Sequence, residues 1–327
     1  MAFVQSLPPW RVGARGAALA CCAIGLAACG GGGGGEAAPV TTQATLTAPG
    51  AESATGNLVT AVPPATYQPG SDARAAYDLL NSRRAQCGFG LLAQSRGLDQ
   101  AASAHLDYMV ANRIQTHSED PANPGFTGAT PKARAIAAGY SAGGVGEIMA
   151  GSSFLLPPGD FVTEMLLDVP YHAAVAFEPL RDVGIAYGSG FIVIDPGVQT
   201  GGSLQSAPGV HTYPCDGVTG VHPSVSGEEP SPFPGDAYGT QWGPTISVVG
   251  SAVQVAKASV TGPGGSVAIR AILGDGATRD PNGFCQGKNA CVIPSPLAAG
   301  AQYQVHIEGT DSGKPFTSDF SFATAEF

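Results

Sequence analysis

A change of hydrophobic period partway along the chain is the feature that most narrows its possible folds. From Ser71 to about Asp168 apolar side chains recur every three or four residues, as in amphipathic helices. Short β-branched and aromatic runs follow at 183–187 and 191–194, and Gly188-Ser189-Gly190 between them is typical of a hairpin. Helices that precede strands within about 130 residues predict a layered α+β domain and not alternating βαβ units.

Four helices are expected in this region, at about residues 71–87, 98–112, 130–139 and 160–168. The third has Thr130 as its N-cap and Pro131 in its first turn. The fourth is expected to stop at Pro170. The apolar stripe of the second helix is interrupted by His105, which we expect to be a core histidine satisfied by a backbone or carboxylate partner.

The chain on either side of this region differs in composition. Residues 29–70 are rich in Gly, Ala, Thr and Pro without a sustained apolar period, which predicts a flexible tether. Residues 206–240 are dense in Pro and Gly and are expected to form a linker. Apolar runs between glycine turns in residues 241–327 predict a small all-β sandwich. The segment around Tyr303 resembles the tyrosine corner of immunoglobulin-like and fibronectin-like modules.

Residues 1–28 have the order of an export signal. Arg11 and Arg15 provide a basic flank, a short apolar run follows, and the segment ends at Leu26-Ala27-Ala28-Cys29. This ending resembles a lipobox, which implies cleavage before Cys29 and acylation of its sulfur, although an ordinary signal peptide could be cut near the same place. Acylation would anchor the protein stably to a membrane. We therefore expect an outer-membrane or periplasm-facing lipoprotein, with the cell surface as an alternative.

The cysteines fit an oxidising compartment. The chain has seven, of which three belong to the signal peptide or the lipidation site: Cys21, Cys22 and Cys29. The remaining four are Cys87, Cys215, Cys285 and Cys291, an even number that predicts two disulfides with three possible connectivities. We favour Cys285 with Cys291 across the CQGKNAC loop, and Cys87 with Cys215 by elimination. The spacing argues against a zinc knuckle or a redox motif.

The negative net charge of the chain limits the kinds of partner that it can bind. The formal net charge is −10, and loss of Arg11 and Arg15 with the signal makes it −12. An acidic chain is a poor partner for phosphate-rich polymers, so we expect no nucleic acid. No apolar stretch long enough to span a bilayer follows the signal.

Several short segments of residues 71–205 follow one another in a characteristic order. They are Leu79-Leu80-Asn81-Ser82-Arg83, Ala101-Ala102 with His105 and Met109, Thr116-His117-Ser118, Gly139-Tyr140 with Gly146-Glu147-Ile148, Pro170-Tyr171-His172, and Val183-Gly184-Ile185-Ala186. In this order they resemble the bacterial, SCP-like branch of the CAP superfamily, which comprises cysteine-rich secretory, antigen 5 and pathogenesis-related 1 proteins. The resemblance covers about 115 residues and implies a CAP-like α-β-α sandwich.

The resemblance also implies a cleft lined by His117, Glu147 and His172. Two imidazoles and one carboxylate can hold a divalent metal such as zinc, with water completing the shell. The resemblance departs from the family at Ala173, where arginine is usual, and at Leu166, where tryptophan is expected. The family's second acid has no secure counterpart, because its position falls on Val169.

Three functions compete. The first is a recognition module at the cell envelope, whose cleft holds a metal or small ligand and whose partners are a lipid, a glycan or an envelope protein. The alternative is a metal-dependent hydrolase of peptide or ester bonds, with Glu147 as its acid or base. A purely structural protein is the third. Binding is favoured over catalysis because the family's second acid is missing.

Overall fold

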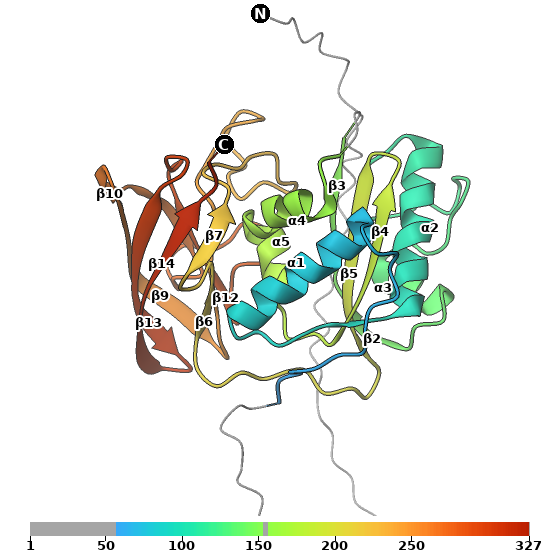
Figure 1. The fold of residues 1–327 in the computed structure, drawn as a ribbon, viewed down its shortest axis with the longest axis horizontal. Helices are drawn as coiled ribbons and strands as arrows, with labels where there is room; N and C mark the ends of the chain where they lie inside the picture. Colours follow the sequence, from blue (N-terminus) through green and yellow to red (C-terminus); the bar gives the residue numbers. More distant parts are fainter. Residues whose placement is uncertain (1–56, 153–155, 327) are drawn as a thin grey trace, which may run out of the picture.

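The computed structural model describes residues 57–152 and 156–326. They form two units that lie side by side, a helix-covered sheet and an all-β unit (Figure 1). The predicted signal peptide, Cys29 and all of the predicted tether before Asn57 lie outside the described residues. Within the described ranges, no helix is both long enough and apolar enough to cross a membrane.

The helices of the first unit are α1 (Asp72–Gln86), α2 (Arg96–Asn112), α3 (Pro131–Ala137), α4 (Gly159–Leu167) and α5 (Pro170–Ala176). Local signals fix several of their ends. The Ser71 side chain accepts a hydrogen bond from the backbone of Arg74, and Thr130 caps α3 in the same way through Ala133. Helix α3 is followed by Gly139 in the left-handed region, at φ 84°.

One mixed sheet forms the middle layer of this unit. Its strands are β1 (Ala93–Gln94), β2 (Ala142–Val145), β3 (Ile148–Gly151), β4 (Asp182–Gly188) and β5 (Phe191–Gln199). They run in the order β1-β4-β5-β2, and β3 also pairs with β5. Strands β4 and β5 form the expected antiparallel hairpin, with Ser189 at φ 50° in its turn.

Helices cover both faces of this sheet, and β5 shows why. Its side chains alternate between two cores. Ile192 and Ile194 pack on the side of α1, whereas Phe191 and Val193 pack on the side of α2. In Figure 1, α2 lies on one side of β4 and β5, and α1, α4 and α5 lie on the other. The result is a three-layer α-β-α arrangement, so the α+β class predicted from the sequence is confirmed.

The second unit is a sandwich of two sheets. Its strands are β6 (His211–Tyr213), β7 (Val218–Val221), β8 (Ile246–Val249), β9 (Val253–Gly262), β10 (Gly265–Val267), β11 (Ile269–Leu273), β12 (Asn289–Pro294), β13 (Gln302–Asp311) and β14 (Lys314–Thr324). One sheet has the order β10-β9-β13-β14-β7 and the other β11-β12-β8-β6. The Tyr303 hydroxyl accepts a hydrogen bond from the Ala298 backbone at 2.7 Å, which is the kind of bond expected of a tyrosine corner.

Three sequence-based expectations differ from the structure. Residues 57–70, the described end of the predicted flexible tether, pack on the first unit, where the Leu91 N–H donates to the Val59 carbonyl at 2.8 Å and the Tyr67 hydroxyl donates to Asp99 at 2.5 Å. The expected linker at 206–240 contributes β6 and β7, which pair with β8 and β14 respectively. These strands are too short for a hydrophobic period to reveal them between prolines and glycines. Pro170 was expected to stop the fourth helix, but α4 already ends at Leu167 and Pro170 is the first residue of α5. Proline is well tolerated there because the first helical N–H has no partner in the helix.

Both predicted disulfides are confirmed. Cys87 is bonded to Cys215, and Cys285 to Cys291. The first joins the C-cap of α1 to the chain just after β6, so it ties the two units together. The second closes the loop between β11 and β12.

Further contacts fasten the two units across their junction. Glu164 on α4 accepts hydrogen bonds from Arg83 on α1 at 2.8 Å and from the Tyr213 hydroxyl on β6 at 2.6 Å. The Tyr171 hydroxyl on α5 donates to Asp280 of the second unit. One hydrophobic core contains residues of both units. The second unit therefore supports α5, which carries His172.

Candidate functional site

Two of the three predicted site residues are in direct contact. Glu147 lies between β2 and β3, and its side chain is buried. Its Oε1 accepts a hydrogen bond from Nδ1 of His117 at 2.8 Å. The His117 side chain is 40% exposed, so its ring lies at the protein surface while its Nδ1 is bonded to the buried Glu147 carboxylate.

Arg134 on α3 holds this pair in place. Its NH2 group donates a hydrogen bond to Glu147 Oε2, and its NH1 group donates to the backbone carbonyl of His117 at 3.1 Å. Arg134 is itself buried. Both oxygens of Glu147 therefore accept hydrogen bonds, and His117 is fixed by one hydrogen bond to its ring and another to its backbone carbonyl.

A second buried carboxylate–imidazole pair lies beside the first. His105 on α2 bonds to Glu119 Oε1 through Nδ1 at 2.9 Å and to the Thr116 carbonyl through Nε2 at 2.7 Å. This is the satisfied core histidine that the sequence predicts. Its Nε2 also lies 3.7 Å from Glu147 Oε1, so the two pairs form one buried network. Glu119 accepts further bonds from the backbone of Thr127 and Gly128, which orders the loop before α3.

The network controls the protonation of Glu147. Burial alone would raise the pKa of this carboxyl group, but the hydrogen bond from His117 and the positive charges around it outweigh burial and lower the pKa to about 2. Those charges belong to His105, Arg134 and His117. Glu147 is therefore ionised throughout the physiological pH range.

A further buried acid lies close to Glu147. Asp195 on β5 is fully buried, and neither of its oxygens has a hydrogen-bond partner among the described residues. Burial and the neighbouring charge of Glu147 raise the pKa of Asp195 well above its usual range. A negative charge on Asp195 is therefore disfavoured.

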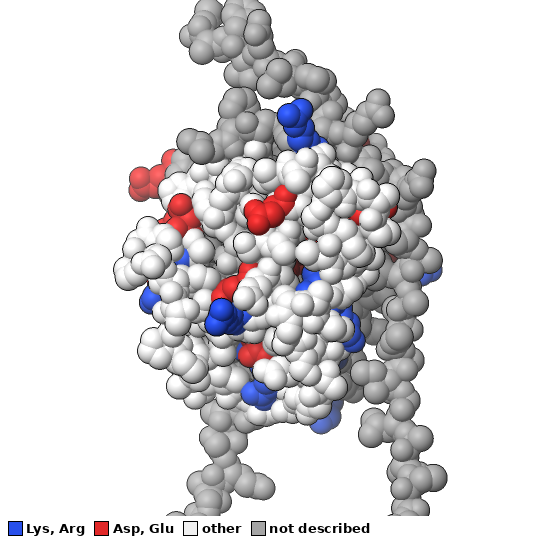
Figure 2. Space-filling view, turned by 90° about the vertical axis from the view of Figure 1, so that its right-hand side faces the viewer, with Lys and Arg blue, Asp and Glu red and all other residues white. Residues whose placement is uncertain are grey.

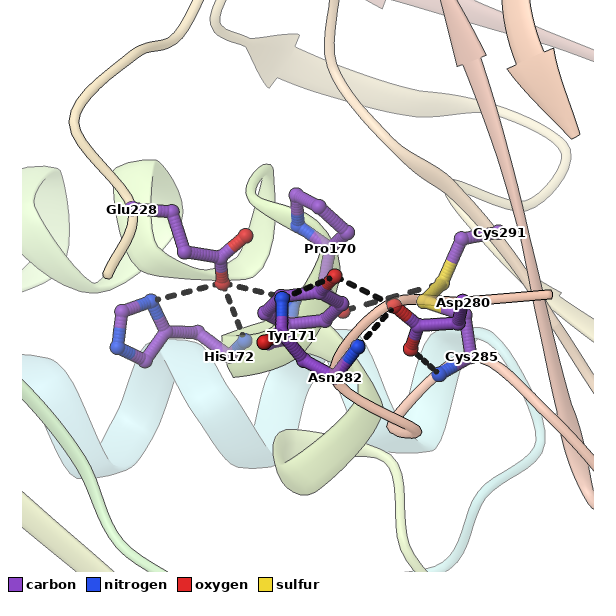
Figure 3. Close-up of a disulfide and its surroundings, with 8 residues drawn as sticks. All are labelled: Pro170, Tyr171, His172, Glu228, Asp280, Asn282, Cys285 and Cys291. Atoms are coloured by element: carbon purple, nitrogen blue, oxygen red, sulfur yellow. Dashed lines mark hydrogen bonds and ion pairs between the residues drawn. A yellow bond between two sulfur atoms is a disulfide. The ribbon is translucent and has the colours of Figure 1, made fainter. Parts of the chain in front are cut away.

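His172, the third predicted residue, has other neighbours. It lies on α5, and its ring faces Glu228, with Nδ1 at 3.4 Å from Oε1 (Figure 3). No hydrogen bond or ion pair among the described residues joins it to His117 or Glu147. Burial, and then the positive charge of His117, lower the pKa of His172 to about 3. The two imidazoles are thus near enough to interact electrostatically, but among the described residues no hydrogen bond or ion pair joins all three side chains.

Glu228 places His172 through the backbone of α5. One oxygen of Glu228 accepts the backbone N–H groups of Tyr171 and His172, at 2.7 Å and 2.9 Å (Figure 3). Burial raises the pKa of this carboxyl group to about 8. The segment that holds Glu228 was expected to be a linker, so sequence reasoning gave no sign of this role.

The donor atoms do not form the metal site that the resemblance implies. Glu147 uses both oxygens for His117 and Arg134, which makes it an orienting group for His117 and not a free ligand. Zinc sites normally have three protein ligands or more. Among the described residues, no group of three or more His, Cys, Asp or Glu side chains is arranged to hold a metal ion. No chemical step is therefore assigned to a metal.

One face of the molecule is mostly uncharged. On the face of the molecule shown in Figure 2, lysine, arginine and acidic side chains are scattered singly among uncharged residues. The charges of the His117 network are mostly buried and paired with one another. His117 is the member of this network that a binding partner can reach.

Comparison with known proteins gives partial matches. No family model matches the chain, and no curated protein matches it. Among solved structures it is similar to an extracellular protein containing an SCP domain from Bacillus anthracis, with 19% identity and a TM-score of 0.34 over 39% of this chain and 40% of that one. It is also similar to an outer surface protein from Borrelia burgdorferi, with 19% identity and a TM-score of 0.33 over 39% of this chain and 93% of that one.

Proposed function

We propose that this chain is an exported, lipid-anchored protein of the CAP superfamily that binds a component of the cell envelope through His117. The order of the SCP-like segments supports the family. The signal-like residues 1–28, the lipobox-like Cys29 and the two disulfides support export and anchoring. The three-layer arrangement is the one that the resemblance implies.

The observation that best supports a binding role is that Glu147 is buried with both carboxylate oxygens hydrogen-bonded. A general acid or base works best with a pKa near the operating pH and must reach the proton that it transfers. Glu147 is buried, has both oxygens engaged and titrates at a pKa of about 2. It is suited to orient and polarise His117, and it is unsuited to the catalytic role that a hydrolase requires.

The geometry of His117 fits recognition of a polar ligand. In the neutral form of the ring that donates Nδ1–H to Glu147, Nε2 is an acceptor at the surface. A ring held by a buried carboxylate and by its own backbone loses little freedom on binding, which favours affinity. Hydroxyl, amide or ammonium groups of an envelope component are the donors that such an acceptor selects.

Co-sedimentation with isolated cell envelopes tests this proposal. A chain that starts at residue 30 lacks the anchor site, so any sedimentation reports on the folded part. We expect saturable binding by the unsubstituted chain and a clear loss in His117→Ala and Glu147→Gln. Phe126→Ala, at a residue that is also 40% exposed, is the matched control and should bind normally. Equal binding by His117→Ala and the unsubstituted chain would contradict the proposal.

Turnover measurements separate binding from the hydrolase alternative. We expect no hydrolysis of a p-nitrophenyl ester or of casein, with or without added zinc. Turnover that a chelator abolishes and that Glu147→Gln removes would replace the binding role with catalysis.

A further inference from the structure

A buried carboxylate and imidazole join the two units at the end of α4, which lies beside β7 (Figure 1). Asp168 is the C-cap of α4, and its Oδ2 accepts a hydrogen bond from the backbone N–H of His222 at 2.8 Å and lies 2.9 Å from Nδ1 of the same residue. The backbone carbonyl of Asp168 accepts another hydrogen bond from the Thr245 N–H at 2.8 Å. One residue of the first unit therefore binds two separate segments of the second.

The Asp168–His222 pair is shielded from water. Asp168 is fully buried, and His222 is 7% exposed. Phe161, which is also on α4, packs with its edge against the His222 ring at 4.9 Å between ring centres. The Oδ1 atom of Asp168 is buried and has no hydrogen-bond partner within residues 57–152 and 156–326. A charge on this pair is therefore only partly compensated by hydrogen bonds.

The titratable groups around the pair come from α1, α4 and β6. Glu164, one turn before Asp168 on α4, forms an ion pair with Arg83 on α1 at 2.8 Å and accepts a hydrogen bond from the Tyr213 hydroxyl on β6. Burial raises the pKa of this hydroxyl well above its usual range, so it keeps its proton at neutral pH. Within this cluster, a change of charge near neutral pH therefore belongs to Asp168 and His222.

The protonation of the pair depends on pH. Burial raises the pKa of Asp168 to about 7 against the hydrogen bonds from His222, and the negative charge of Glu164 adds to the rise. With one proton bound, the pair has no net charge, whether the proton lies on the carboxyl group or on the ring. Loss of that proton leaves a buried carboxylate beside Glu164 with one oxygen unpaired, which costs free energy.

We propose that the Asp168–His222 pair makes the junction between the two units sensitive to pH: the junction is closed while the pair binds a proton and loosens when that proton leaves. The sign follows from linkage. Because the pKa of Asp168 is higher in the folded chain than its ordinary value of 3.8, the stabilisation is present in acid and is lost as the pH rises through about 7.

The loosening is local. The Cys87–Cys215 disulfide also joins the two units, and it keeps them linked at every pH in this range. Helix α5, which carries His172, follows Asp168 directly along the chain, so a looser junction changes the support of that helix. Envelope binding through His117 is a separate proposal, and the pH response does not rest on it.

Trp242 reports on the junction. It is 3% exposed and belongs to one buried cluster with Val169 and Tyr171 of the first unit, and Val169 is the residue after Asp168. The other tryptophan, Trp10, lies in the predicted signal peptide, so emission of a chain that starts at residue 30 comes from Trp242 alone. Quenching of this emission by acrylamide should increase about twofold or more between about pH 6 and about pH 9.

Nuclear magnetic resonance follows the proton itself. The nitrogen-15 signals of the His222 ring should show a step centred at about pH 7. Because the two groups share one proton, these signals change whichever of the two loses it. His222→Gln identifies the signals by their absence.

Variants assign the step to the pair. Asp168→Asn keeps the shape of the side chain but cannot titrate, so Trp242 quenching should stay constant with pH and the His222 step should move by about one pH unit or more. Asp78→Asn is the matched control, because this acid is 53% exposed in its ion pair on α1, and it should keep both responses. Glu228→Gln should also keep both, although burial raises the pKa of Glu228 to about 8.

Four results would overturn the proposal. They are a His222 signal without a step between about pH 5 and about pH 9, Trp242 quenching that does not increase with pH, both responses persisting in Asp168→Asn, and loss of both in Glu228→Gln. The first two need only the unsubstituted chain, so they decide the proposal even if Asp168→Asn does not fold.

Discussion

Replacing Glu147 by glutamine tests the buried network most sharply. The variant keeps the shape of the side chain but removes its charge, and its amide NH₂ must face either His117 or Arg134, both of which donate to Glu147 in the structure. Arg134 would remain buried with Glu119 as its nearest acid, at 3.8 Å. Removing one partner of a buried ion pair costs about 3–5 kcal/mol. We expect the free energy of unfolding at neutral pH to fall by about that amount.

Urea unfolding followed by circular dichroism measures this loss. Arg134→Met and the double variant complete a cycle, in which the double variant should lose less than the sum of the two single changes because neither partner is left alone. Glu308→Gln is the matched control, since its ion pair with Lys257 is exposed at both ends. It should change the unfolding free energy by less than about 1 kcal/mol.

Two results would refute this reasoning. One is a loss below about 1 kcal/mol in Glu147→Gln, the size typical of an exposed pair. The other is additivity of Glu147→Gln and Arg134→Met, which would mean that the two side chains do not interact.

The other predictions concern pH, metal, the anchor and a buried arginine. Glu228 has a raised pKa, so it stabilises the fold at low pH and loses this effect as pH rises from about 4.5 to about 8; Glu228→Gln should flatten the stability profile there by up to about 1.4 kcal/mol per pH unit. A chelator should leave Tm unchanged, and a fall of several degrees would reveal a bound metal. Cys29→Ser should move the exported protein from the membrane to the soluble fraction, and a variant that stays in the membrane would contradict lipidation. Arg84 is fully buried, and within residues 57–152 and 156–326 its side chain donates hydrogen bonds to the backbone carbonyls of Phe89, Gly90, Ala176 and Glu178. Arg84→Met should lower the unfolding free energy by about 3 kcal/mol or more, and a loss near zero would contradict that role.

Patterns with a local physical cause could be predicted from the sequence. The cap at Thr130, the hairpin at 183–194 and the short Cys285–Cys291 loop each depend on neighbouring residues, and the structure contains all three. His105 could be assigned to the core because an imidazole on an apolar stripe needs a buried partner, and Glu119 is that partner. Strands β6 and β7 were missed because pairing with distant strands, and not their own composition, makes them strands.

The candidate site was predicted only in part for the same reason. The resemblance brought His117 and Glu147 together, and the structure joins them directly. Arg134 and Asp195 were missed, because their importance comes from tertiary contacts that no local motif encodes. His172 was grouped with the other two on the basis of the family pattern, yet its nearest acid is Glu228, 56 residues further along the chain.

Nuclear magnetic resonance of the histidine side chains tests the central claim, that Glu147 fixes His117 as a surface acceptor. In mildly alkaline solution, nitrogen-15 spectra of the unsubstituted chain should show the His117 ring protonated at Nδ1 with Nε2 bare, and Glu147→Gln should alter this tautomer preference. His117→Ala identifies the signal. A His117 ring that is protonated mainly at Nε2, and that does not respond to Glu147→Gln, would contradict the account.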